Sequence, residues 1–120
     1  MKNGLNLFPA ATVDDGTVSI RFADQLPSQS IDVKCIVDLT DFGDVIGVEV
    51  LDWRRQLSGG VLDAQSARGP VRWSYDDEID AFYIHLTEGR SQIQRSTVAS
   101  VGLDSNRCVV RLQVPIPSAV

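Results

Sequence analysis

The feature that most constrains the fold of this chain is the alternation of apolar and polar side chains along most of its length. Apolar residues recur at every second position, the spacing that places them on one face of a β-strand. Seven such runs occur, at residues 18–22, 33–39, 46–50, 71–75, 82–86, 97–103 and 108–114. Strands with one apolar and one polar face are typical of an antiparallel sheet that has one face in water. The pattern therefore predicts at least seven antiparallel strands.

The segments between these runs favour tight turns. Thirteen of the sixteen acidic residues are Asp, whose short side chain hydrogen-bonds nearby backbone N–H groups in turns and caps. Polar stretches at 40–44, 76–80 and 104–107 predict three β-hairpins. One helical turn is expected at 53–57, capped by Asp52 and ended by the Ser-Gly-Gly stretch that follows. We expect a mainly β domain, or an α+β domain with little helix, packed as a sandwich or a flattened barrel.

The chain also resembles itself at a constant offset of 64 residues. Residues 17–51 overlay residues 81–115 without a gap, with five identities in 35 positions and matching apolar positions. We interpret this as two diverged pseudo-repeats, at about 5–57 and 70–117, joined by a linker at about 58–69 and related by an approximate two-fold axis. A half of this size has a marginal core, so we expect one domain over residues 1–120 with a shared core. Its expected members are Val37, Ile46, Val48, Phe82, Ile84, Val101, Val110 and Leu112.

Charge and composition restrict the partners and the compartment. Sixteen acidic against eleven basic residues give a net charge of -5, a sign that disfavours nucleic-acid binding. No window approaches the roughly 18 apolar residues of a membrane span, and the first residues lack the apolar core of a signal peptide. We expect a cytoplasmic protein that binds neither nucleic acid nor membrane. Cys35 and Cys108 are expected as reduced core thiols, with a disulfide or a reactive thiol as alternatives.

Two segments resemble signatures of a prokaryotic family of small proteins, domain of unknown function 2283. Residues 75–86 read Tyr-Asp-Asp-Glu-Ile-Asp-Ala-Phe-Tyr-Ile-His-Leu and are similar to the family's opening signature, Tyr-Asp-x-Glu-x-Asp-Ala-x-Tyr-Ile-x-Leu. The stretch 37–52, with Val37-Asp38, Gly43 and Gly47-Val48-Glu49, resembles the closing signature. Each half thus resembles the family through a different end. The resemblance implies a compact β-rich module of uncharacterised function in two diverged copies, and it supplies no catalytic residues.

One spacing imitates a calcium-binding loop but fails in detail. Asp38, Gly43 and Glu49 occupy the first, sixth and twelfth positions of such a loop. Phe42 stands at the fifth position, where the loop needs an oxygen ligand, and strand patterns rather than helices flank the segment. The stretch is therefore interpreted as a hairpin turn, and we expect no metal site and no cofactor.

The acidic stretch Asp76, Asp77, Glu78 and Asp80 is the most concentrated charge in the sequence. Because it lies between two strands, these carboxylates are expected to accept backbone N–H groups and hold a turn. Binding of a cation or acid–base catalysis are the alternatives. His85 is the single histidine, which excludes a paired-imidazole zinc site and favours a surface or interface role. The candidate binding residues are Tyr75, Asp76, Glu78, Asp80, Tyr83 and His85.

Two functional hypotheses follow, and the sequence favours the one that is not an enzyme. The first is a non-catalytic protein-interaction or oligomerisation module, with a second copy or another protein as partner. It is favoured by the lack of catalytic motifs and by Trp53, Trp73, Tyr83, Arg54 and Arg55, residue types enriched in interfaces. The alternative is a small-molecule-binding or substrate-processing protein with a cleft near His85, Tyr83 and the acidic turn at 76–80.

Overall fold

A computed structural model describes residues 8–60 and 70–118 of the chain. Within these ranges the chain forms eight β-strands and one short α-helix, which confirms the predicted mainly β fold. The strands are β1 (Ala10–Asp14), β2 (Thr17–Arg21), β3 (Gln29–Leu39), β4 (Val45–Leu51), β5 (Arg72–Asp76), β6 (Ala81–His85), β7 (Ile93–Leu103) and β8 (Val109–Pro115). The helix α1 (Trp53–Leu57) lies between β4 and β5 and forms where the sequence predicts it.

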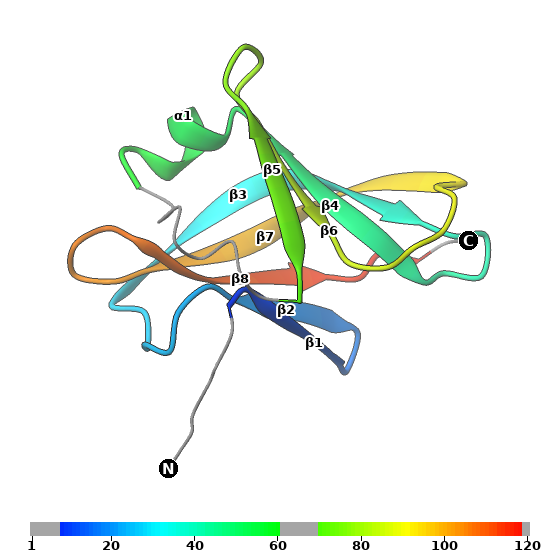
Figure 1. Ribbon diagram of the computed structural model, residues 1–120, viewed down its shortest axis with the longest axis horizontal. Helices are drawn as coiled ribbons and strands as arrows, with labels where there is room; N and C mark the ends of the chain where they lie inside the picture. The colour runs from blue at the N-terminus through cyan, green and yellow to red at the C-terminus, as the bar shows by residue number, and fades with distance from the viewer. Residues whose placement is uncertain (1–7, 61–69, 119–120) are drawn as a thin grey trace.

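All eight strands belong to one antiparallel sheet, in the order β1-β2-β8-β7-β3-β4-β6-β5. The sheet curls into a half-barrel, and Figure 1 shows β5 crossing in front of the opposite end of the sheet. The residues that precede the two edge strands meet, because the Val71 N–H donates to the Pro9 carbonyl at 3.2 Å. Of the two packings expected, this single curled sheet corresponds to the flattened barrel.

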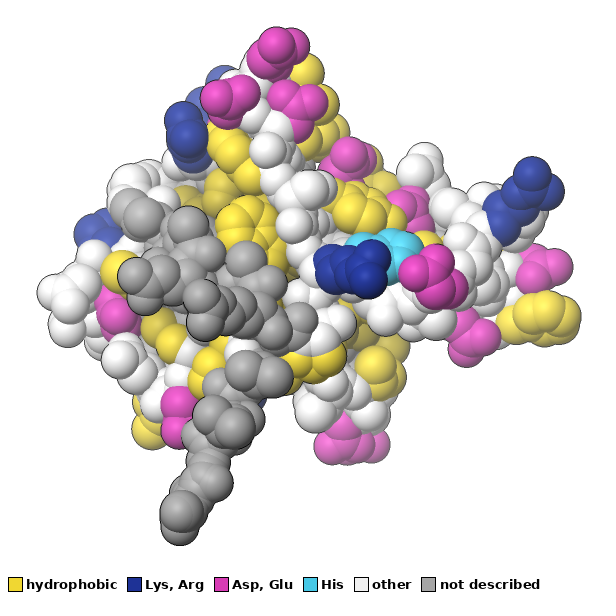
Figure 2. Space-filling model, viewed as in Figure 1, with side chains coloured by type: hydrophobic (Ala, Val, Ile, Leu, Met, Phe, Trp, Pro, Cys, Tyr) yellow, Lys and Arg dark blue, Asp and Glu magenta, His cyan; other side chains and the backbone are white. Residues whose placement is uncertain are grey.

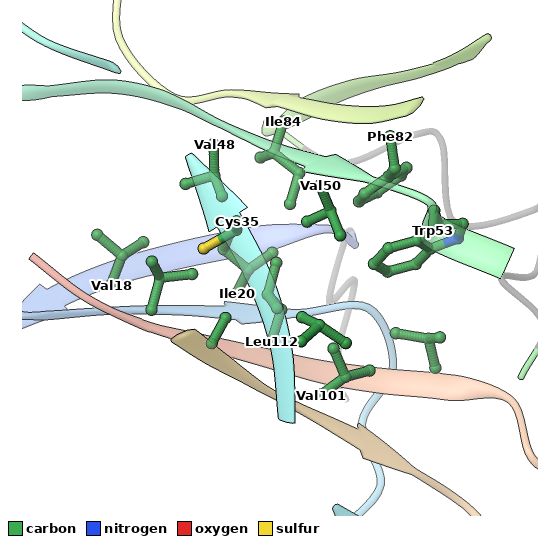
Figure 3. Close-up of a cluster of buried hydrophobic side chains, with 14 of the residues drawn as sticks. Val18, Ile20, Cys35, Val48, Val50, Trp53, Phe82, Ile84, Val101 and Leu112 are labelled. Carbon is green, nitrogen blue, oxygen red and sulfur yellow. The ribbon is translucent and has the colours of Figure 1, made fainter. Parts of the chain in front are cut away.

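The concave side of the sheet holds one apolar cluster. Figure 3 shows side chains of β2 and β8, among them Ile20 and Leu112, lying opposite side chains of β4 and β6, among them Val48 and Ile84. All eight predicted core residues are buried, and six of them belong to this cluster. Ile46 and Val110 are buried outside it. The cluster draws on both sequence segments, and the expectation that Ile46 and Val110 belong to it is wrong.

The strand positions repeat at the offset found in the sequence. β2, β3 and β4 begin and end 64 positions before β6, β7 and β8. Each long hairpin carries a bulge, between Asp38 and Leu39 in one and between Gly102 and Leu103 in the other, again 64 positions apart. These matches concern only the positions of strands and bulges in the fold. Descent of the two segments from one duplicated sequence stays a prediction, and most of the expected linker lies outside the described residues.

Strand β1 was not expected from the alternation. It pairs only with β2, at the edge of the sheet, and its last three side chains are exposed. Val13 is 66% exposed although it is apolar. An edge strand without a buried face carries no two-residue pattern, so the hydrophobicity signal fails there.

The predicted cap of α1 is wrong in one respect. Asp52 stands at the N-cap position, but its side chain accepts no hydrogen bond from the first turn of the helix. Its Oδ2 instead faces Nη2 of Arg55 at 3.3 Å. Asp80 provides the side-chain acceptor, 26 positions away in the sequence. A cap that comes from a distant turn leaves no local sequence pattern.

Gln56 connects α1 to the sheet at the end of the β3–β4 pairing. The regular β3–β4 pairing begins at Ile36, so Lys34 has no backbone partner on β4. The Gln56 carboxamide takes that place: its Oε1 accepts the Lys34 N–H at 2.7 Å, and its Nε2 donates to the Lys34 carbonyl at 3.1 Å. The amide thereby satisfies both backbone groups of Lys34, as a strand residue would.

Cys35 is a free thiol buried in the core, as expected, whereas Cys108 is only half-buried. Burial raises the pKa of the Cys35 thiol to about 11, so the thiolate that would make it reactive is disfavoured. Among the described residues no helix has the length and apolar character needed to cross a membrane.

Candidate functional site

The acidic turn joins β5 to β6 and uses two of its carboxylates to hold the backbone. Oδ1 of Asp76 accepts the Glu78 N–H at 3.0 Å, which closes the turn as expected. Acidic side chains gather at this hairpin tip, and basic side chains lie beside it over α1 (Figure 2). In the described part of the chain, no three His, Cys, Asp or Glu side chains lie close enough to share a metal ion.

Asp80 links the turn to α1. Its Oδ1 and Oδ2 accept the Arg54 N–H at 3.0 and 3.2 Å, and its backbone carbonyl accepts the Trp53 N–H at 3.0 Å. Oδ1 also accepts the Tyr75 hydroxyl at 2.6 Å. The first turn of the helix is therefore held by the β5–β6 hairpin rather than by its own preceding residue.

These contacts shift the ionisation of both partners. Partial burial acts to raise the pKa of Asp80. The hydrogen bonds from Tyr75 and from the N–H groups of Arg54 and Arg55, with the charge of Arg54, outweigh it and hold that pKa below its usual value. The same hydrogen bond to Asp80, with burial and the nearby carboxylates, raises the pKa of Tyr75. Asp80 is therefore the ionised acceptor and Tyr75 the neutral donor of the pair.

An aromatic pocket of about 430 Å³ lies between α1 and the β5–β6 hairpin. Its walls are Trp53, Arg54, Gly59, Gly60, Trp73, Tyr75 and Phe82. Phe82 forms the centre of the aromatic group: the Trp53 ring stacks on it with centroids 4.3 Å apart, and the Trp73 ring lies tilted at 5.5 Å. Because these rings hold one another, the pocket has fixed walls.

Two hydrogen-bond donors in the pocket wall lack partners within the described residues. The indole Nε1 of Trp73 is fully buried and has none. The guanidinium of Arg54 lies over the Tyr75 ring, 4.9 Å from its centroid, and forms no salt bridge or side-chain hydrogen bond in residues 8–60 and 70–118. A buried donor without an acceptor costs about 1–3 kcal/mol, so Trp73 marks a polar position that the described chain leaves unfilled.

A second polar cluster lies on the opposite face of the sheet. Tyr83 donates to Oδ2 of Asp38 at 3.1 Å, and Gln94 donates to Oδ1 at 2.8 Å, so the buried Asp38 carboxylate is satisfied. Burial, followed by the charge of Asp38 and its hydrogen bond, raises the pKa of Tyr83 to about 12. Gly47 lies directly beneath the Tyr83 ring, and a Cβ there would approach the Ile84 carbonyl oxygen to 2.6 Å. The cluster cross-links three strands and leaves no acceptor of Asp38 unused.

His85 lies further along the Tyr83 face of β6. Its Nε2 is 3.5 Å from Oε1 of the exposed Glu88, and Arg72 is its neighbour on β5. Figure 2 shows the histidine between a basic and an acidic side chain. A surface position agrees with the role favoured from the sequence.

The structure thus divides the predicted candidate residues. Tyr75 and Asp80 lie together beside the aromatic pocket, whereas Tyr83 and His85 lie on the other face of β6. The cleft expected near His85, Tyr83 and the acidic turn is therefore not one site. This separation could have been predicted from the sequence. Neighbouring residues of a strand point to opposite faces of the sheet, so Tyr83 lies on the face opposite the buried Phe82. Tyr75 pairs directly with Phe82 and shares its face.

Comparison of the chain with protein-family models, with curated proteins and with solved structures finds no match. The resemblance to domain of unknown function 2283 therefore stays a prediction.

Proposed function

We propose that this protein is a non-catalytic binding module whose ligand occupies the aromatic pocket between α1 and the β5–β6 hairpin. The observation that carries the proposal is a cavity of about 430 Å³ with four aromatic side chains in its wall. Small-molecule sites are typically concave, about 300–1,000 Å³ in volume and mostly apolar, with few polar groups. The pocket fits that description. The proposal keeps the non-catalytic role expected from the sequence. It places the binding site at the aromatic pocket rather than near His85 and Tyr83.

The fixed geometry of the walls supports binding. The Asp80 carboxylate holds α1 against the hairpin, and the stacked rings of Trp53 and Phe82 fix the floor. Walls that are already ordered lose little conformational entropy when a ligand enters. Of the polar side chains in the wall, Arg54 presents only hydrogen-bond donors, and the pKa of Tyr75 lies above its usual value, so its hydroxyl stays a donor. Neither supplies a general base, which favours binding over catalysis.

A neutral aromatic probe tests the proposal. Ligand-observed NMR with 2-naphthamide is expected to show binding to the wild-type chain and loss of binding to Trp73→Leu, which removes one wall. Phe42→Leu is the matched control, since Phe42 is 89% exposed on the β3–β4 turn and far from the pocket wall in sequence. Tyr75→Leu changes the wall at a second position. Absence of binding to the wild type, or equal binding to Trp73→Leu and Phe42→Leu, would reject the pocket as a binding site.

A second candidate function, self-association or docking of another protein, is favoured by the outer face of the sheet. A cavity of about 660 Å³ lies there between α1, β3, β4 and β7. Its wall includes Leu51 and Val98, apolar side chains that are 42% and 50% exposed. Sedimentation equilibrium of the wild type and of Val98→Glu tests this candidate. A dimer that the substitution dissociates would support it, and a wild-type monomer at high concentration would exclude self-association.

A further inference from the structure

The aromatic pocket has more unused hydrogen-bond donors than acceptors, and this excess indicates the chemistry of its ligand. The guanidinium of Arg54, a side-chain donor in the wall, forms no salt bridge within the described residues. The nearby carboxylate of Asp80 is already used, because its two oxygens accept the Tyr75 hydroxyl and the Arg54 N–H. A complementary ligand must therefore bring acceptors rather than donors.

The placement of Arg54 favours an anionic acceptor. Its guanidinium lies 4.9 Å from the Tyr75 ring centroid, a cation–π contact that holds the group at the pocket wall. A guanidinium presents its N–H groups in a planar fork that matches the two oxygens of a carboxylate. Arg54 is thus a positioned cation that forms no salt bridge in the described part of the chain, although its charge also lowers the pKa of the nearby Asp80.

A cationic ligand is the rival, because aromatic walls and the acidic turn could both attract one. Three observations oppose it. Arg54 already lies over the Tyr75 ring, so a second cation there would meet like charge. Phe82 has Trp53 and Trp73 packed against it. The turn carboxylates Asp76, Asp77 and Glu78 are exposed, where water and salt screen their charge, and they do not belong to the pocket wall.

We infer that the pocket takes a planar aromatic molecule that carries a carboxylate, with the ring among the aromatic walls and the carboxylate at Arg54. This inference rests on the proposed function, and it adds the chemical class of the ligand. Arg54 is then the residue that determines specificity, while the rings provide affinity common to all flat apolar compounds.

Three probes with the same ring separate the possibilities: 2-naphthoate, 2-naphthamide and 2-naphthylmethylammonium. Isothermal titration calorimetry at low ionic strength is expected to give the tightest binding for the carboxylate, intermediate binding for the amide and the weakest for the ammonium compound. A charge-assisted hydrogen bond at this exposed arginine predicts an advantage of about fivefold to tenfold for 2-naphthoate over 2-naphthamide.

Matched variants assign the effect to its residues. Arg54→Gln keeps the helix and its backbone cap, and it is expected to abolish the advantage of the carboxylate while leaving 2-naphthamide within about twofold. Arg55→Gln is the control: it removes the same charge one position away, from a side chain that is 82% exposed and paired with Asp52.

The outcomes separate this inference from the proposal it rests on. If 2-naphthylmethylammonium bound tightest, or if Arg55→Gln lowered 2-naphthoate affinity as much as Arg54→Gln, the carboxylate specificity would be wrong while the pocket remained a binding site. If none of the three probes bound the wild-type chain, both the inference and the proposed function would be wrong.

Discussion

The Tyr75 hydroxyl lies 2.6 Å from Oδ1 of Asp80, and this hydrogen bond ties the edge strand β5 to the residue that caps α1. Asp80 itself has φ of 52°, a left-handed conformation that Asp and Asn tolerate better than most residues. One carboxylate therefore holds together the strand, the turn and the helix that form the wall of the aromatic pocket.

The first prediction concerns this carboxylate. Asp80→Ala removes the acceptor of Tyr75 and of the Arg54 N–H and places alanine at a positive φ, so the free energy of unfolding should fall by about 1–3 kcal/mol. Asp80→Asn keeps one acceptor oxygen and should lose less. Asp77→Ala, an exposed acidic position in the same turn, is the control. Urea denaturation measures all three, and equal losses for Asp77 and Asp80 would contradict the capping role.

The second prediction concerns acid. The pKa of Asp80 is lower in the folded chain than its ordinary value of 3.8. A lowered carboxyl pKa contributes stability that is complete above the unfolded pKa and disappears as the pH falls through the folded pKa. The difference in unfolding free energy between wild type and Asp80→Asn should therefore be constant from neutral pH to about pH 5 and shrink below the unfolded value. A difference that grows in acid would show the opposite sign.

The third prediction concerns alkali. Tyr83 ionises near 12 in the folded chain against an ordinary value of 10.0. A raised pKa contributes stability that is complete below the unfolded value and is lost as the pH rises through the folded one. Tyr83→Phe should therefore be less stable than the wild type near neutral pH, and the two should converge between pH 10.0 and about 12. Denaturation curves across that range provide the test, and a gap that stays constant would contradict the raised pKa.

The fourth prediction concerns the contact of Gln56 with the sheet. Gln56→Glu keeps the shape of the side chain but removes the Nε2 donor to the carbonyls of Lys34 and Leu51. A carboxylate facing two carbonyl oxygens should lower the unfolding free energy by about 1–3 kcal/mol. The control is Gln92→Glu, at an exposed position whose backbone N–H bonds Leu39. Amide exchange at Lys34 should also accelerate in Gln56→Glu alone.

The architecture could be predicted from the sequence wherever a strand has one buried face. Val18, Ile20 and Phe22 alternate with polar residues and are buried, and the same holds for the long hairpins. β1 escaped prediction because its exposed residues carry no such pattern. Local spacing also misassigned the cap of α1, since the carboxylate that caps it, Asp80, is brought there only by the pairing of β6 with β4.

The site could be predicted only in part. Trp53, Trp73 and Arg54 were recognisable as residue types suited to contacts, and Tyr75 and Asp80 as part of an acidic motif. Their meeting depends on α1 packing beside the β5–β6 hairpin, a long-range contact that no motif encodes. The unused Trp73 N–H is likewise a property of packing rather than of sequence.

The last prediction concerns why the two segments depend on each other. In the sheet, β6 pairs with β4, and β2 pairs with β8, so each segment supplies a hairpin to the other. Lys34 and Val98 lie opposite each other in the central β3–β7 ladder and are 64 positions apart, so they are equivalent positions of the two segments. The two segments therefore meet at this pair in a symmetric way. Neither segment can complete its own side of the sheet.

Within this shared sheet, Ile84 of β6 lies directly opposite Val48 of β4, and both are fully buried in the core cluster. Ile84→Ala should lower the unfolding free energy by about 2–5 kcal/mol, whereas Ile79→Ala, at a side chain 61% exposed on the hairpin tip, should change it by less than about 0.5 kcal/mol. Because both segments share the cluster, the variant should still unfold in one transition by fluorescence and by circular dichroism. Residues 70–120 expressed alone would lack β4 for β6 and β2 for β8. A stable monomer of that fragment, melting at the temperature of the whole chain, would show that the core is not shared.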